Sequence, residues 1–145
     1  MTATRVDQPA EPRVFHLLQG EALDRWHSPT GDVGRVFRGA GIEAVWVSKQ
    51  DEAIDPEWFS QGSVDLIVVI RGQLCVEFAE EGRDRVVLDP GDLLVLPPDT
   101  RCRGYGWPRE RREATVFLAV YPVPGAADGS DTEIARHSIE DHAAN

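Results

Sequence analysis

The sequence predicts an all-β protein in which short antiparallel strands close into a single barrel. Two apolar runs, residues 66–70 and 93–96, have the length of buried strands. The first run ends at the tight turn Arg71-Gly72-Gln73, and the second follows the turn Asp89-Pro90-Gly91-Asp92. Glycine, proline and aspartate in such positions are typical of turns between strands. Because the strands are short and the turns frequent, a small barrel is the architecture that this pattern favours.

Further strands are expected on both sides of this region. In chain order, the strand-forming segments are residues 31–38, 42–49, 58–70, 73–78, 85–88, 93–96 and 114–121. The Gly-Ala-Gly sequence at residues 39–41 predicts a hairpin turn between the first two. A short helix is expected within residues 13–26, with 21–26 as its best segment, and residues 50–57 and 104–108 are expected to be loops.

The length of 145 residues fits one domain with a substantial core. We place the barrel at residues 13–124, after a flexible N-terminal arm of residues 1–12 and before a mobile tail of residues 125–145. No apolar run approaches the roughly 18–20 residues that a membrane span needs. The polar N-terminus has no apolar segment of the kind found in secretory signals. We therefore expect a cytoplasmic protein.

The net charge of −10 argues against nucleic acid or an anionic membrane as a partner. The charge is not uniform, because five arginines lie close together at positions 101, 103, 109, 111 and 112. Such a cluster binds a carboxylate or phosphate in some proteins, and in others it is a solvated loop. Both interpretations stay open at this stage.

Several of the expected strands are apolar on both faces. In residues 65–70, Ile67 and Val69 alternate with three further apolar residues, and residues 93–96 and 116–120 repeat this pattern. An antiparallel sheet with one face in water alternates polar with apolar residues instead. An N-terminal segment or a second copy of the chain must therefore cover the outer face, and we favour a homodimer.

Residues 91–106 resemble the second sequence motif of the cupin superfamily. That motif is a glycine, five residues, a proline, one residue, a glycine, two residues, a histidine and, three residues on, an asparagine. Gly91 and Pro97 match it. Asp99, Cys102 and Gly106 stand at its second glycine, its histidine and its asparagine.

The first cupin motif is represented more weakly. Gly72 matches its final glycine, Asp65 falls on its glutamate, and Gln61 and Phe59 fall on its two histidines. The resemblance covers residues 58–105. It implies an antiparallel jelly-roll barrel whose ligands bind to inward-facing strand positions near one open end.

The same alignment removes the metal ligands that cupins usually carry. Phe59 cannot bind a metal, and Gln61 is a poor ligand for a transition metal. Asp65 and Cys102 could both bind, but a stable site usually needs at least three good protein ligands. We therefore expect no metal site and no cofactor.

Two residues in these aligned positions are candidates for catalysis. Asp65 is a candidate general acid or base, since apolar neighbours raise a carboxyl pKa; alternatively it is a polar residue that starts a strand. Cys102, flanked in sequence by two arginines, is a candidate nucleophile. Alternatively, and in keeping with the usual burial of cysteine, it is a small apolar residue that fills the space of a lost ligand.

Four more residues are candidates for substrate binding. Gln61 and Arg103 can donate hydrogen bonds, and the rings of Phe59 and Tyr105 can form walls around an organic ligand. Alternatively, Phe59 fills the space left by a metal site, in which case the barrel is packed solid.

Three functions are compatible with these residues. The first is a metal-independent cupin that binds a small organic molecule, with isomerase, cyclase and lyase of secondary metabolism as its candidate activities. The second is a non-catalytic module that senses a ligand or assists another protein. The third is a metal cupin with a degenerate site of Asp65, Cys102 and a histidine from the N-terminal region, His16 or His27.

Overall fold

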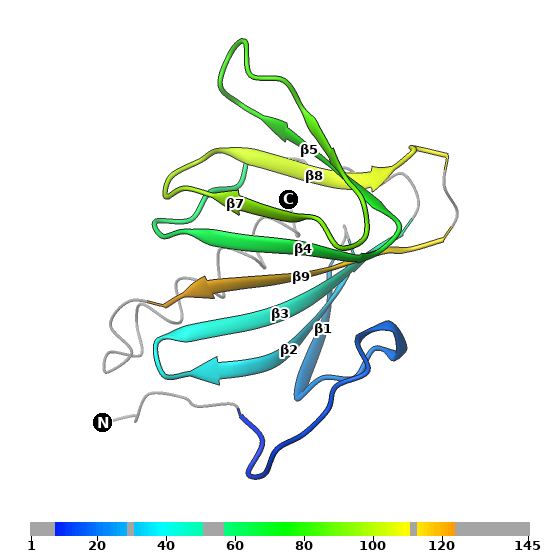
Figure 1. Ribbon diagram of the computed structural model, residues 1–145, viewed down its shortest axis with the longest axis vertical. Coiled ribbons are helices and arrows are strands. Elements are labelled where there is room, and N and C mark those ends of the chain that lie inside the picture. Colours follow the sequence, from blue (N-terminus) through cyan, green and yellow to red (C-terminus); the bar gives the residue numbers. More distant parts are fainter. Residues whose placement is uncertain (1–7, 29–30, 51–56, 111–112, 124–145) are drawn as a thin grey trace.

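The computed structural model describes residues 8–28, 31–50, 57–110 and 113–123. Within these residues, one short 3-10 helix, Leu17–Gln19, precedes nine strands (Figure 1). The strands are β1 (Asp24–Ser28), β2 (Gly31–Gly39), β3 (Ile42–Lys49), β4 (Asp65–Arg71), β5 (Gln73–Phe78), β6 (Val86–Leu88), β7 (Leu93–Leu96), β8 (Cys102–Trp107) and β9 (Thr115–Pro122). No helix of the described residues is long and apolar enough to cross a membrane.

The strands form two antiparallel sheets around one core. The larger sheet has the order β1-β2-β3-β9-β4-β7, and the smaller has the order β6-β5-β8. β9 pairs with both β3 and β4, so strands far apart in sequence become neighbours in the middle of the larger sheet (Figure 1). This arrangement is the all-β jelly-roll barrel that the sequence predicts.

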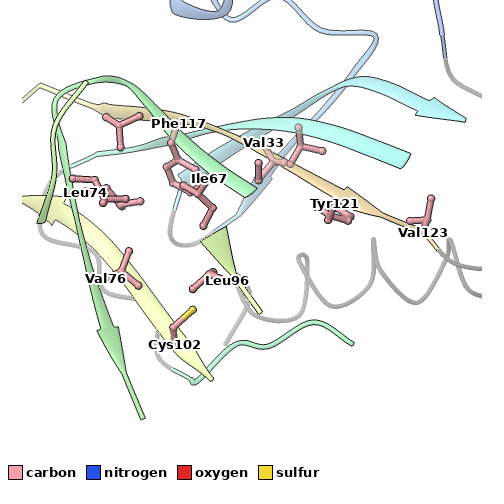
Figure 2. Close-up of a cluster of buried hydrophobic side chains, with 13 residues drawn as sticks. Val33, Ile67, Leu74, Val76, Leu96, Cys102, Phe117, Tyr121 and Val123 are labelled. Atoms are coloured by element: carbon pink, nitrogen blue, oxygen red, sulfur yellow. The ribbon is translucent and has the colours of Figure 1, made fainter. Parts of the chain in front are cut away.

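The core lies between the two sheets. Figure 2 shows Leu74, Val76 and Cys102 of the smaller sheet on one side of it, with Ile67 and Phe117 of the larger sheet on the other. Alternate residues of each strand enter the core because successive side chains of a strand point to opposite faces. The polar residues that lie on the same inward positions therefore face the interior of the barrel.

Two turns lie where the sequence predicts them. In the β2–β3 hairpin, Ala40 and Gly41 both have positive φ angles, 51° and 80°, as a two-residue hairpin with a right-handed strand twist requires. Before β7, Gly91 has a φ of 92°, and the Asp92 N–H donates to the Asp89 carbonyl at 2.9 Å. A side chain other than that of glycine is disfavoured at such angles.

The structure corrects two expectations about local structure. The helix expected within residues 13–26 is reduced to Leu17–Gln19, and Asp24–Ser28 is instead strand β1, paired with β2. The loop expected at residues 104–108 is mostly strand β8, paired with β5. Residues 1–7 of the predicted arm, residues 51–56 of the predicted loop and the predicted tail at 125–145 lie outside the described residues.

Candidate functional site

A cavity of about 90 Å³ lies inside the barrel. Most of its wall is apolar and includes Val33, Val45, Leu74, Val76 and Phe117. Its polar lining residues are Ser28, Lys49, Gln61, Arg103 and Tyr121. Since roughly 10–15 Å³ of such space admits one water molecule, the cavity has room for a small organic molecule. The barrel is therefore not packed solid.

Three residues predicted from the sequence lie together on this wall: Phe59, Gln61 and Cys102. Phe59 and Cys102 pair as an isolated antiparallel bridge, with N–H to carbonyl distances of 2.7 and 2.8 Å. The Asp99 N–H donates to the Gln61 carbonyl at 2.7 Å. These backbone hydrogen bonds hold the segment before β4 against the start of β8, so residues 59 and 61 both reach the cavity.

Asp65, the first residue of β4, lies beside this group but does not itself line the cavity. Its side chain is buried, with 4% of the residue exposed. Gln61 Nε2 donates to Asp65 Oδ2 at 3.4 Å, and Oδ1 has no hydrogen-bond partner among the described residues. Burial raises the pKa of Asp65 to about 7, although the hydrogen bond from Gln61 acts in the opposite direction. The carboxyl group can therefore gain or lose a proton near neutral pH.

Arg103 lines the cavity and also makes contacts outside it. Its Nε donates to Glu77 Oε1 at 3.0 Å, and its guanidinium lies 4.5 Å from the centre of the Trp58 ring. These contacts fix the Arg103 side chain and neutralise much of its charge. We therefore expect Arg103 to shape the cavity more than to bind a charged ligand.

Tyr105 does not line the cavity. It pairs with Cys75 across the β5–β8 ladder, and its ring centre lies 6.3 Å from that of Trp107. Burial raises the pKa of Tyr105 to about 12, and the Cys75 thiol adds to this effect. The structure thus separates Tyr105 from the other candidate binding residues.

A buried network of charged residues adjoins the cavity, and no sequence motif indicated it. Arg35 is fully buried; it donates to Glu43 Oε1 at 2.7 Å and to Asp24 Oδ2 at 2.8 Å. The Tyr121 hydroxyl, on the cavity wall, donates to Glu43 Oε2 at 2.8 Å. Burial, followed by the Glu43 charge, raises the pKa of Tyr121 well above its usual 10. The hydroxyl therefore stays protonated, and its oxygen can accept a hydrogen bond from a ligand.

Lys49 is a second cavity residue that the motifs did not indicate. It is the last residue of β3, only 5% exposed, and it lines the cavity. The alternation of Val45 and Val47 with their neighbours was the available signal. Extending this alternation by one step in each direction places Glu43 and Lys49 on the same inward face.

Comparison with known proteins bears on the fold. No protein-family model matches the chain, and no curated protein matches it. Among solved structures, a cupin superfamily protein from Desulfitobacterium hafniense matches 81% of this chain and 97% of its own length, with a TM-score of 0.59 and 14% identity. A cupin-like protein from Thermotoga maritima matches 68% and 74%, with a TM-score of 0.53 and 18% identity. The chain has the cupin fold.

One further structure places this fold within a larger protein. An HTH_3 family transcriptional regulator from Vibrio cholerae matches 66% of this chain with a TM-score of 0.53 and 20% identity. The matched region covers about half of that regulator, 52% of its length.

The described residues do not fit the metal that proteins with this fold usually bind. Within residues 8–28, 31–50, 57–110 and 113–123, no group of three or more histidine, cysteine, aspartate or glutamate side chains could hold an ion. Neither candidate histidine lines the cavity. His16 precedes the 3-10 helix, and the exposed His27 ring bonds to Asp32 at 2.6 Å through Nδ1. The structure thus does not assemble the degenerate metal site with His16 or His27.

Proposed function

We propose that this cupin binds a small, largely apolar organic molecule inside its barrel and does so without a metal. The observation that carries this proposal is the apolar cavity lined by Phe59, Gln61 and Cys102, the positions that hold metal ligands in the cupin motifs. An apolar cavity with a few convergent polar groups is typical of small-molecule sites. Tyr105 lies outside the cavity and is given no ligand contact.

For catalysis, we propose that Asp65 acts as the general acid or base. A carboxyl group with a pKa of about 7 is suited to proton transfer at neutral pH. Gln61 contacts both the cavity and Asp65, so it is the residue that positions the carboxyl group relative to a ligand. Isomerases, cyclases and lyases all use proton transfer of this kind. Cys102 either forms part of the cavity wall or acts as a nucleophile.

A matched pair of variants tests binding. Ala119 lines the cavity, and Ala44 lies on the opposite face of the same sheet, where it pairs with Val120. Ala119→Leu fills part of the cavity, whereas Ala44→Leu leaves it open. A metabolite found by thermal-shift screening should stabilise the wild type and Ala44→Leu equally, by about 2.7 kcal/mol at a hundred times its Kd. It should stabilise Ala119→Leu much less; equal stabilisation of all three proteins would contradict binding inside the barrel.

Elemental analysis of the purified protein tests metal independence. The expected result is no metal near one equivalent per chain. This part of the proposal would be overturned if the protein held one equivalent of zinc, iron or nickel and lost ligand binding when a chelator removed the metal.

The second candidate function is a ligand-sensing module without catalysis. The similarity of the fold to half of a transcriptional regulator favours it, as does the absence of Asp65 from the cavity wall. Asp65→Asn distinguishes the two functions once a ligand is known. If the wild type converts the ligand to a product and Asp65→Asn binds the ligand without converting it, the protein is an enzyme. If the wild type binds the ligand but forms no product, the protein is a sensor.

We also propose that two copies of the chain associate as a homodimer. The supporting observation is the outward face of β7, where Leu93 is 57% exposed and Val95 is 51% exposed. Exposed apolar surface of this kind commonly marks a site of association. Cys75 and Cys102 are buried and form no disulfide bond among the described residues, which suits the reducing cytoplasm that we propose as the compartment.

A further inference from the structure

We propose that the molecule in the cavity is an apolar compound with a hydroxyl group, and that this hydroxyl donates a hydrogen bond to the phenol oxygen of Tyr121. This inference rests on the proposed function and names the ligand class of the same site. It goes beyond the cupin motifs, which do not include position 121.

Tyr121 and two buried carboxyl groups lie in one row across the larger sheet. On one side of β9, Tyr121 pairs with Glu43 of β3. On the other side, Val120 pairs with Leu66 of β4. The next step of this antiparallel register brings Asp65 opposite Tyr121. Because directly opposite residues have Cβ atoms roughly 4.5–5.5 Å apart, the Tyr121 ring lies between the two carboxyl groups.

The single proton of the Tyr121 hydroxyl is already used within the protein. The hydroxyl donates to Glu43 Oε2 at 2.8 Å, and Arg35 donates to the other oxygen of that carboxylate at 2.7 Å. Burial, followed by the Glu43 charge, raises the pKa of Tyr121 well above its usual range, so the hydroxyl keeps this proton. A phenol has one donor, and its oxygen can still accept. Toward a ligand, Tyr121 is therefore an acceptor.

The polar groups beside Tyr121 also favour a donor on the ligand. Gln61, on the cavity wall, directs its Nε2 to Asp65 Oδ2 at 3.4 Å, which turns its own carbonyl oxygen away from Asp65. Asp65 is 4% exposed, and its Oδ1 is a buried acceptor with no hydrogen-bond partner among the described residues. Leaving buried acceptors without donors is unfavourable. This end of the cavity is thus rich in acceptors and short of donors.

The charges next to Tyr121 favour a neutral donor over an ion. The negative charge of Glu43 would repel an anionic ligand group. Arg35 already balances this charge at 2.7 Å, so the pair offers little net attraction to a cationic group. An ion that enters an apolar cavity without a counter-charge loses its hydration at a high cost. A hydroxyl group supplies the donor without that cost.

The cationic residues of the cavity wall are placed away from Tyr121. Lys49 ends β3 six residues after Glu43, and six residues correspond to about 20 Å of strand. Arg103 belongs to the smaller sheet, where it bonds to Glu77 at 3.0 Å. Most of the remaining wall is apolar, so it suits a ligand whose body is a hydrocarbon chain or ring.

Calorimetric titration with matched probes tests the inference. The probes are the primary alcohols from butanol to octanol, together with the methyl ketone and the primary amine of each chain length. The alcohol can donate a hydrogen bond, the ketone can only accept one, and the amine is charged at neutral pH. Wild-type protein should bind the best alcohol about tenfold more tightly than its ketone, the effect of one lost hydrogen bond that leaves an acceptor unpaired. It should bind the amine more weakly than the alcohol.

In Tyr121→Phe, which keeps the ring and loses the acceptor oxygen, alcohol and ketone should bind equally. Tyr105→Phe is the matched control, because Tyr105 is also a buried tyrosine of a strand but does not line the cavity; its preference should match the wild type. Equal binding of alcohol and ketone by the wild type, tighter binding of the amine, or an unchanged preference in Tyr121→Phe would overturn the inference while leaving the proposed cavity function intact. Failure of every alcohol to bind would also overturn it. The comparison of Ala119→Leu with Ala44→Leu tests the cavity function separately.

A second measurement does not depend on the folding of Tyr121→Phe. The chain has two tyrosines, so Tyr121 is the single tyrosine of Tyr105→Phe. The intensity ratio of the tyrosine doublet in the Raman spectrum rises when a phenol that donates a hydrogen bond also accepts one. Titration of Tyr105→Phe with the best alcohol should raise this ratio, and titration with the ketone should not. An unchanged ratio at saturating alcohol would contradict a hydrogen bond to the Tyr121 oxygen.

Discussion

Asp65 has a raised pKa because its carboxyl group is buried in the barrel interior, where its side-chain hydrogen bond comes from the neutral amide of Gln61. Burial is the largest cause of the raised pKa, and the amide of Gln61 compensates only in part. By contrast, Glu43 is also buried but contacts Arg35 at 2.7 Å and accepts a hydrogen bond from Tyr121. Two buried carboxyl groups of the same barrel are thus placed in different electrostatic environments. The pKa of Asp65 is raised to about 7.

This difference predicts an unusual pH dependence of stability. The pKa of Asp65 is raised from 3.8 to about 7 on folding. The folded state therefore holds its proton longer than the unfolded state, and stability falls as pH rises from about 4 to 7. The whole effect is roughly 4 kcal/mol, of which about 2 kcal/mol falls between pH 5.5 and pH 8. Relative to the wild type, Asp65→Asn should gain about 2 kcal/mol of stability over that interval.

Urea denaturation of both proteins at the two pH values measures this gain. Asp84→Asn, at an exposed position in the turn before β6, should follow the wild type at both pH values. If the difference between Asp65→Asn and the wild type is the same at pH 5.5 and pH 8, Asp65 is not a buried carboxyl group of raised pKa.

At the scale of elements, β2 and β3 are joined to the N-terminal segment through Trp46. The ring lies on the outward face of β3 opposite Gly34, and Trp46 Nε1 donates to the Glu21 carbonyl at 2.7 Å. The Arg25 guanidinium lies 5.4 Å from the ring centre. Trp46 is consequently 2% exposed although it lies outside the barrel. The N-terminal segment thus covers part of the apolar outer face, as one of the two sequence alternatives required.

We expect Gly34→Ala to disturb this contact. An added Cβ would overlap the indole ring of Trp46, which cannot move outward without losing its hydrogen bond to Glu21. The expected loss is about 1–3 kcal/mol in the free energy of unfolding, as for other overpacked sites. Chemical denaturation measures it. Gly62→Ala is the control, because its added Cβ meets no atom within 4 Å; equal stability of the two variants would show that the Trp46 contact tolerates a shift.

Local sequence signals predicted most strands, but they did not predict β1 and β8, which are strands because they pair with β2 and β5. β8 contains Gly104 and Gly106, which lower its strand propensity, yet β5 supplies a partner along its whole length. Residues 24–26 read as helix because their local composition permits one, but pairing with β2 makes them a strand. Neither partner can be identified from the segment itself.

At the scale of the whole molecule, the cupin motifs indicated residues that line the cavity, while the role of these residues in binding or catalysis stays a prediction. Phe59, Gln61 and Cys102 meet on the cavity wall as the resemblance implied, and Asp65 lies beside them. Lys49 and the Arg35–Glu43 pair were missed because a charged residue in a strand normally indicates a solvent-facing position. Tyr121 was missed because no motif singles it out from the other residues of its strand. Their burial follows from the closure of the barrel, which only the strand order of both sheets reveals.

An apolar surface stays exposed on β7, the edge strand of the larger sheet that lies opposite β1 in the strand order. From this surface we predict how the molecule assembles. On β7, Leu93 and Val95 point outward and pair with Val68 and Leu66 of β4, both of which are half-buried. We expect wild-type protein to have twice the chain mass of 16.1 kDa in solution. Val95→Lys should weaken association roughly tenfold or more, since it buries a charge at the interface.

Light scattering coupled to size-exclusion chromatography over a dilution series measures the masses. The control is Val87→Lys, at a position 37% exposed on β6 of the smaller sheet, which should remain dimeric. Thermal unfolding of both variants verifies that each is folded. A monomeric wild type at every concentration, or a Val95→Lys protein that dimerises as the wild type does, would exclude this face as the interface. Loss of the dimer in Val87→Lys alone would place the interface on the smaller sheet instead.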